Sequence, residues 1–192
     1  MKESVLFSVL LAAGSSYRFG STKQLQTIDG SPMVARTARL CESICAYRSV
    51  VVLGNDWAAV HNACAPLSGF LVINPDHKTG IASSIRQGVA AVRTQADGLL
   101  LMLADQPSVN AAHLQVLAAR WQASPNTIIA SAYADTMGPP IIFPKQDFDA
   151  LTELKGDAGA KSILLDRSER LQTIACEDAA LDIDVPEDLE RI

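Results

Sequence analysis

The stretch Leu11-Ala12-Ala13-Gly14-Ser15-Ser16-Tyr17-Arg18-Phe19-Gly20-Ser21-Thr22-Lys23 decides the fold, because it directly follows the apolar run Val5 to Leu11. A buried strand with this run places the loop at the carboxyl edge of a sheet, where open α/β folds bind their ligands. Glycine and alanine allow close backbone approach, and successive N–H groups can bind an anion. Arg18 and Lys23 add two positive charges. The stretch therefore predicts a site for a triphosphate.

Two familiar phosphate-binding motifs do not fit this stretch. A Walker motif requires four residues between its glycines and a lysine directly after the second, whereas Gly14 and Gly20 enclose five residues and Lys23 lies further on. The dinucleotide fingerprint requires glycine where Ser16 stands. Neither a P-loop NTPase nor an NAD-binding protein is indicated.

Two simpler interpretations of the stretch concern turns and export. Glycine and serine are common turn residues after strands, and each of them alone predicts no ligand. The apolar segment before Ala12-Ala13-Gly14 also resembles a secretory signal with a small-residue cleavage site. Glu3 interrupts the basic start of such a signal, and cleavage would remove half of the motif.

The composition indicates one compact domain spanning residues 1–192. The chain has 48% hydrophobic and 19% charged residues, a net charge of -5 and a pI near 5.1. An acidic chain has no general attraction to nucleic acid or anionic membranes, and no apolar segment approaches the roughly 20 residues that span a bilayer. The four cysteines form no Cys-x-x-Cys pair. We expect a soluble cytoplasmic protein without metal-binding or disulfide-bonded cysteines.

The rest of the chain alternates between strand and helix patterns, which favours an α/β fold with a mostly parallel sheet. Predicted strands are Val5–Leu11, Ser49–Leu53, Phe70–Ile73, Leu99–Ala104, Ile128–Tyr133, Ile141–Phe143 and Leu171–Ala175. Predicted helices are Pro32–Ala46 with Ser31 as N-cap, Asn55–Pro66, Ile81–Thr94, Asn110–Gln122, Phe148–Leu154, a short one ending near Leu165, and one starting at Pro186.

Asp105 follows the most continuous aliphatic strand and is the first candidate metal ligand. It should lie at the same sheet edge as the Gly14 loop. Mg²⁺ typically takes one or two carboxylates and completes its shell with water and phosphate oxygens. Asp182 and Asp184 are candidates for the second carboxylate, and they point the same way if the segment is extended. Alternatively, Asp105 is a turn residue before Pro107 and Asp184 caps the last helix.

Three segments resemble signatures of the MobA-like nucleotidyltransferases, which transfer nucleotides to the molybdenum cofactor. Residues 11–23 match Leu-Ala-Ala-Gly-x-Ser-x-Arg-x-Gly-x-x-Lys. Leu103-Ala104-Asp105-Gln106-Pro107 resembles the family's Gly-Asp-Gln-Pro motif, with alanine replacing glycine. Asp182-Ile183-Asp184-Val185-Pro186-Glu187-Asp188-Leu189 resembles its closing motif. The resemblance implies a Rossmann-like three-layer α/β/α domain in which Asp105 and Asp184 share Mg²⁺ or Mn²⁺, and in which Arg18, Lys23 and the Leu11–Ser16 segment hold the triphosphate.

Two further segments resemble the cytidylyl-transferring branch. Residues 74–88 match Asn-Pro-x-x-x-x-Gly-x-x-x-Ser-Ile-x-x-Gly, which implies a base and ribose pocket with Asn74, Gly80, Ser83 and Ser84. His77 and Lys78 either reach a substrate or are solvated. Residues 154–161 resemble the family's Leu-x-Gly-Asp-x-Gly-Ala-Arg, with Lys161 in place of arginine. With Gly138, Pro139 and Pro140, this implies an acceptor site containing Gly138, Pro139, Gly156, Asp157, Gly159 and Lys161.

The resemblance implies transfer of CMP from CTP to the phosphate of molybdopterin, a pterin-phosphate cofactor, with a molybdenum hydroxylase-type client enzyme. Two alternatives are the same chemistry with GTP or with a sugar or alditol phosphate acceptor. A third is a catalytically silent nucleotide-binding accessory protein of a molybdenum enzyme. A Rossmann-type oxidoreductase is disfavoured by the missing second glycine.

Overall fold

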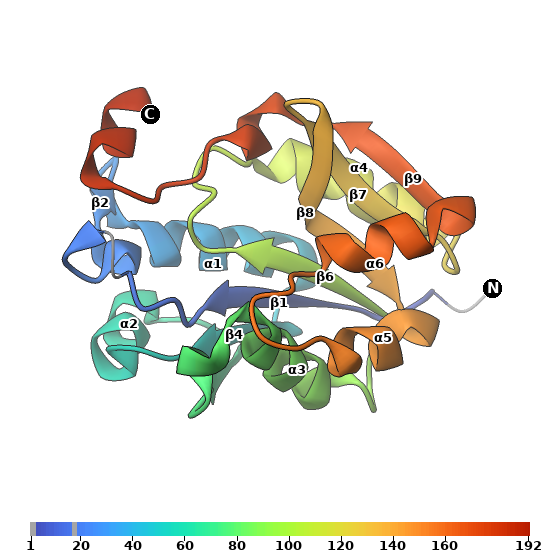
Figure 1. Ribbon diagram of the computed structural model, residues 1–192, viewed down its shortest axis with the longest axis horizontal. Helices are drawn as coiled ribbons and strands as arrows, with labels where there is room; N and C mark the ends of the chain where they lie inside the picture. The colour runs from blue at the N-terminus through green and yellow to red at the C-terminus, as the bar shows by residue number, and fades with distance from the viewer. Residues whose placement is uncertain (1–2, 17–18) are drawn as a thin grey trace.

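The computed structural model describes residues 3–16 and 19–192, and it contains a seven-stranded central sheet (Figure 1). Across the sheet, the strands follow the order β5-β4-β1-β6-β8-β7-β9. Their bounds are β1 Leu6–Ala12, β4 Ser49–Leu53, β5 Phe70–Ile73, β6 Gly98–Leu103, β7 Ile128–Tyr133, β8 Thr136–Pro144 and β9 Leu171–Ala175. Within this sheet, neighbouring strands run parallel except at β8, which is antiparallel to both of its neighbours. The expected mostly parallel α/β fold is confirmed.

Helices cover both faces of the sheet and produce three layers (Figure 1). One face packs against α1 (Met33–Cys45), α2 (Trp57–Cys64) and α4 (Ala111–Ala123). The other packs against α3 (Ile81–Val92), α5 (Phe148–Glu153) and α6 (Lys161–Asp166). Because both faces are covered, every residue of β1 and β4 is buried, which explains why these strands are apolar without alternation. No helix within the described ranges is long and apolar enough to cross a membrane.

Short elements fill the connections between these layers. A two-stranded ribbon pairs β2 (Thr27–Ile28) with β3 (Ser31–Pro32). Short 3₁₀ helices cover η2 Lys23–Leu25, η3 His77–Thr79, η4 Lys145–Asp147, η5 Ser168–Arg170, η6 Glu177–Ala180 and η7 Pro186–Arg191. The C-terminal segment passes the carboxyl end of β6, where Ile183 N donates a hydrogen bond to Asp105 O at 2.9 Å.

Two local predictions from sequence are wrong. Ser31 is not the N-cap of α1: it lies in β3, and Pro32 occupies the cap position without a side-chain hydrogen bond. The strand expected over Ile141–Phe143 is longer: it begins at Thr136 and forms β8, a nine-residue strand that pairs with β7 across an irregular register. In both places pairing with a neighbouring strand overrides the turn preference of glycine and proline.

His113 connects α4 to the antiparallel strand through a buried hydrogen-bond chain. Ser131 Oγ donates to Pro140 O at 2.9 Å, so its single hydroxyl proton is used there. His113 Nε2, 2.8 Å from Ser131 Oγ, therefore carries the proton of the neutral ring and donates it to that oxygen. Burial lowers the pKa of His113 below its ordinary value, and the charge of Asp178 only partly opposes this.

We predict that His113 makes the protein less stable in acid. The unfolded chain binds a proton on this histidine near pH 6.5, whereas the folded chain binds it only at lower pH, so the free energy of unfolding falls as the pH drops through about 6.5. Urea unfolding of the wild type and His113→Gln between pH 8 and 5 checks this. The free energy of unfolding of the variant should depend less on pH than that of the wild type. An identical pH dependence in both proteins contradicts the assignment.

Gly98, the first residue of β6, has no room for a side chain. A Cβ atom there would lie 2.2 Å from Trp121 Cζ2 and 2.7 Å from two other atoms of the same indole. Trp121 is fully buried on α4, so its ring cannot move into solvent. The glycine therefore permits α4 to pack closely on the sheet.

We expect Gly98→Ala to lower the free energy of unfolding by about 1–3 kcal/mol, the usual cost of an extra methyl group in a filled core. Urea denaturation measures it. The same substitution in a Trp121→Leu background should cost clearly less, since the clashing ring is gone. Equal costs in the two backgrounds would show that the indole is not the obstacle.

Candidate active site

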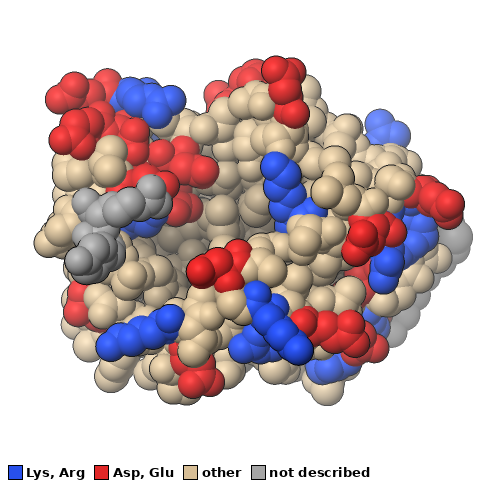
Figure 2. All heavy atoms as spheres, viewed as in Figure 1, with Lys and Arg blue, Asp and Glu red and all other residues tan. Residues whose placement is uncertain are grey.

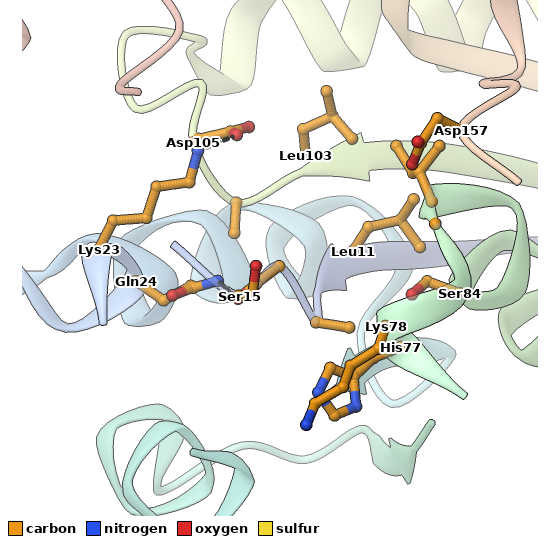
Figure 3. Close-up of a pocket in the computed structure, with 15 residues that line it drawn as sticks. Leu11, Ser15, Lys23, Gln24, His77, Lys78, Ser84, Leu103, Asp105 and Asp157 are labelled. Atoms are coloured by element: carbon orange, nitrogen blue, oxygen red, sulfur yellow. Dashed lines mark hydrogen bonds and ion pairs between the residues drawn. The ribbon is translucent and has the colours of Figure 1, made fainter. Parts of the chain in front are cut away.

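A cavity of about 560 Å³ opens where β1 and β6 end (Figure 3). It is lined by segments far apart in the sequence: Leu11, Ala13, Gly14, Ser15, Lys23, Gln24, His77, Lys78, Gly80, Ile81, Ser84, Leu103, Ala104, Asp105 and Asp157. Acidic side chains gather near the C-terminal segment at this end of the molecule (Figure 2). The cavity lies at the carboxyl edge of the sheet, as the sequence predicts for the ligand site.

The buried side chain of Gln24 fixes the Gly14 loop through hydrogen bonds. Its Nε2 donates to Gly14 O at 2.9 Å, and its Oε1 accepts from Ser16 Oγ at 3.0 Å. Ser16 Oγ in turn accepts from Lys23 N at 3.1 Å. Gln24 is 2% exposed, so the loop and the lysine are fixed to one another by buried hydrogen bonds. The sequence analysis did not identify Gln24, since only the fold shows that its amide is buried.

Lys23 joins the two predicted metal ligands. Its Nζ lies 2.7 Å from Asp105 Oδ2 and 3.0 Å from Asp184 Oδ1, and Figure 3 shows Lys23 and Asp105 pointing toward each other. Burial by itself lowers the pKa of Lys23, but the carboxylates, Asp105 above all, outweigh it and raise the pKa above its ordinary value. The lysine is therefore a permanent cation between two anions at neutral pH.

Asp182 adds a third carboxylate to this region. Partial desolvation, then the negative charge of Asp105 and to a smaller extent that of Asp184, raise the pKa of Asp182 to about 6. Between the two aspartates, Ile183 is fully buried, against Phe19, Ile28 and Met33. This apolar contact and the backbone bond from Ile183 N to Asp105 O fix the segment beside β6.

The carboxylate pair suits a hard divalent cation. Asp105 Oδ1 is buried and has no hydrogen-bond partner in the structure, so one lone-pair-bearing oxygen remains for a ligand. The described residues contain no cluster of three or more histidine, cysteine, aspartate or glutamate side chains arranged to hold a metal. One or two carboxylates with phosphate and water oxygens is the usual magnesium shell, so Asp105 and Asp184 fit this ion only together with a phosphate ligand.

The predicted base and ribose residues divide into two groups. Asn74 and Ser83 are buried and mutually hydrogen-bonded: Asn74 Nδ2 donates to Ser83 Oγ at 2.8 Å, and Ser83 Oγ donates to Gly80 O at 2.8 Å. They support the start of α3. Gly80 and Ser84 line the cavity itself. Asn74 also binds Ser84 Oγ at 3.0 Å and so positions that hydroxyl.

His77 lines the cavity. The half-buried ring has Nδ1 3.2 Å from Asn74 O. A carbonyl only accepts, so Nδ1 carries the proton of the neutral ring. Lys78 lines the same wall, and its side chain lies beside His77 in Figure 3.

The predicted acceptor residues are not brought together. Gly156 O accepts a hydrogen bond from Ala82 N at 3.1 Å, and a Cβ at Gly80 would lie 2.2 Å from that oxygen. This contact brings Asp157 into the main cavity. Lys161 instead contacts Thr136 Oγ1 in β8, and Gly138 packs against the Tyr133 hydroxyl group. Gly138, Pro139, Gly159 and Lys161 are not among the described residues that line the cavity.

The remaining predicted residues belong to the first loop. Four residues of this loop line the cavity: Leu11, Ala13, Gly14 and Ser15. Ala12 is instead buried in the core between the sheet and helices α1, α2 and α4, and Ser16 is hydrogen-bonded to Gln24. Arg18, a predicted triphosphate ligand, lies outside the described residues.

Solved structures show the same fold. The crystal structure of Rv0371c from Mycobacterium tuberculosis is 30% identical, with a TM-score of 0.83 over 99% of this chain and 98% of that chain. A structure of Rv0371c in complex with manganese is 28% identical, with a TM-score of 0.81 over 99% and 97%. A nucleotidyl transferase from Methanothermobacter thermautotrophicus shares the fold at 21% identity, with a TM-score of 0.83 over 97% and 95%.

Sequence comparison gives relatives of equal length and a family. Purine catabolism protein PucB of Bacillus subtilis is 29% identical over 100% of this chain and 98% of its own. Nicotine blue oxidoreductase of Paenarthrobacter nicotinovorans is 30% identical over 96% and 94%. The sequence pattern described as MobA-like NTP transferase domain matches residues 8–172, which include the Gly14 loop, Lys23 and Asp105. The chain therefore belongs to the MobA-like NTP transferase domain family.

Proposed function

We propose that the protein transfers CMP from CTP to the phosphate of molybdopterin or Mo-molybdopterin and releases pyrophosphate. The observation that carries this proposal is the Lys23 ammonium bound to both Asp105 and Asp184 beside the Gly14 loop. A cation, two hard anionic ligands and a small-residue loop at one sheet edge are what a metal-bound triphosphate requires. The whole chain, residues 1–192, acts as one domain in this proposal.

The transfer is an in-line substitution at the α-phosphorus. An oxygen of the acceptor phosphate forms a bond to that phosphorus, and the bond to the bridging oxygen of the β-phosphate breaks, so pyrophosphate leaves with its electron pair. A phosphate nucleophile is already ionised near neutral pH, so no general base is needed. A divalent ion, when bound, supplies charge neutralisation on the phosphate oxygens.

The chain's own residues orient the substrates. Asp105 and Asp184 hold the divalent ion, Lys23 and Arg18 stabilise negative charge on the phosphates, and the Leu11–Ser16 segment supports the triphosphate. Catalysis then consists of positioning and electrostatic stabilisation. Asp157 is the acceptor-site candidate that lines this cavity, and we place the acceptor site there, whereas Gly138, Pro139, Gly159 and Lys161 do not line it.

The choice of CTP and of the pterin phosphate depends on the resemblance of residues 74–88 and 154–161 to the cytidylyl-transferring branch. GTP, or a sugar or alditol phosphate acceptor, are the alternatives within the same chemistry. A molybdenum hydroxylase-type enzyme is the proposed client.

Oxidoreductase activity is a second candidate, because one relative of nearly equal length is named nicotine blue oxidoreductase. The site itself favours nucleotidyl transfer. Hydride transfer has no use for a lysine held between two aspartates, and the loop lacks the glycine spacing of the dinucleotide fingerprint.

We predict pyrophosphate release when the protein is incubated with Mg²⁺, molybdopterin and CTP. Parallel reactions contain GTP, ATP or UTP, or replace molybdopterin with a sugar phosphate, and a coupled assay follows pyrophosphate. Faster release with CTP than with GTP is expected. Equal rates with GTP contradict the specific nucleotide, and oxidation of NADH or NADPH by a quinone-like dye without pyrophosphate release supports the oxidoreductase instead.

Asp105→Asn should reduce turnover by about 10²–10³-fold, because losing several kcal/mol of metal-mediated charge stabilisation corresponds to such a factor. Its melting temperature should stay close to that of the wild type, since the amide keeps the shape of the carboxylate.

Asp135→Asn is the matched control, because Asp135 is an exposed carboxylate with positive φ in the turn after β7, a conformation that asparagine tolerates. It should leave turnover unchanged. If Asp105→Asn instead unfolds the protein, Asp105 has a structural role and the proposed metal site is wrong.

A further inference from the structure

A cation lies between the two proposed metal ligands, and it belongs to the chain itself. We propose that the Lys23 ammonium is a built-in counter-ion that competes with a divalent cation for Asp105 and Asp184, and that it moves to the triphosphate when the metal binds. This inference depends on the proposed function only in assigning a triphosphate to the cavity, and it is independent of which base or acceptor is used.

The distances do not allow both cations on the same two carboxylate oxygens. Lys23 Nζ is 2.7 Å from Asp105 Oδ2 and 3.0 Å from Asp184 Oδ1. A magnesium ion requires oxygens at about 2.0–2.1 Å, so an ion that binds these two oxygens would occupy the region where the ammonium now lies. Two positive charges there would repel each other strongly at the low dielectric of a partly buried site.

The backbone of Lys23 is fixed, so only its side chain can move. Lys23 N donates to Ser16 Oγ at 3.1 Å, and Lys23 O accepts from Gln26 N at 3.0 Å. The side chain is a flexible four-carbon stem with a compact charge. Gly14 and Ser15 line the same cavity as Lys23, so the displaced ammonium stays beside the loop that is proposed to hold the phosphates.

Burial explains why the displaced ammonium needs a new partner. The Lys23 side chain is 12% exposed, and an unpaired charge in such a place is costly. A divalent ion alone would therefore separate Lys23 from its anions and leave it uncompensated. A triphosphate supplies new anions, so metal and nucleotide each strengthen the binding of the other.

The test measures Mn²⁺ binding to the metal-free, nucleotide-free protein, using the paramagnetic resonance signal of free Mn²⁺. Lys23→Met should bind Mn²⁺ at least about tenfold more tightly than the wild type, within the usual range of coupling between sites. Lys23→Arg keeps the positive charge and should bind as weakly as the wild type. Lys78→Met removes a charge from the same cavity without touching the aspartates and should change the affinity little.

Thermal unfolding provides a second readout that does not depend on activity. In EDTA, Lys23→Met should melt at a lower temperature than the wild type, because Asp105 and Asp184 lose their shared counter-ion. Saturating Mn²⁺ should raise the melting temperature of Lys23→Met more than that of the wild type. If Lys23→Met is too unstable to purify, Lys23→Gln takes its place: it also removes the positive charge but keeps an N–H donor for the carboxylates, and it should show the same gain in Mn²⁺ affinity.

Three results overturn the inference: Mn²⁺ binding to Lys23→Met no tighter than to the wild type, an equal gain for Lys78→Met, or a gain of similar size for Lys23→Arg. Failure of the proposed function looks different. If no nucleoside triphosphate releases pyrophosphate but Lys23→Met still gains Mn²⁺ affinity, the competition stands and the proposed reaction fails.

Discussion

The ion pairs from Lys23 to Asp105 and Asp184 are the interaction on which the site depends. They join residues that are 82 and 161 positions apart in the sequence. Such distant groups meet because β1 and β6 are parallel neighbours, so the loops that follow them leave the same edge of the sheet. The backbone hydrogen bond from Ile183 N to Asp105 O then brings in the C-terminal segment. The main contribution of the fold to the site is therefore that it brings oppositely charged side chains into contact.

This arrangement has an energetic consequence for the resting protein. Two close carboxylates repel each other, and a mostly buried lysine loses hydration, so each part alone is unfavourable. Together they compensate one another. The same residues are thus suited to a structural role, and under the proposed function also to a catalytic one. The network beneath them, Gln24 and Ser16, keeps its hydrogen bonds in either role because none of these involve the lysine ammonium.

Most of the fold and part of the site could be predicted from the sequence, because these features depend on local sequence patterns. The remaining features depend on contacts between distant segments. The strand Ser49–Leu53 was located correctly because a parallel strand that is covered on both faces leaves a local signal, a continuous apolar run. Lys23, Asp105 and Gly80 were found through long motifs. The burial of Gln24, the pairing of β8 and the separation of Lys161 from the cavity depend on contacts between distant segments, which no local pattern contains.

The two ends of the cavity are lined by residues of different chemical character. At one end, Lys23 and Asp105 with the Gly14 loop are the residues that we propose for features that all nucleoside triphosphates share, namely charge and phosphate oxygens. At the other, Ser84 and Asp157 with the His77 wall come from α3 and from a segment late in the chain. Ser84 is positioned by Asn74, and Asp157 by the contact of Gly156 with α3, so small changes in either segment reshape this end without disturbing the charges. Under the proposed function, one phosphate chemistry can therefore serve different substrates, and the start of α3 and the Gly156 loop are where we expect substrate identity to be decided.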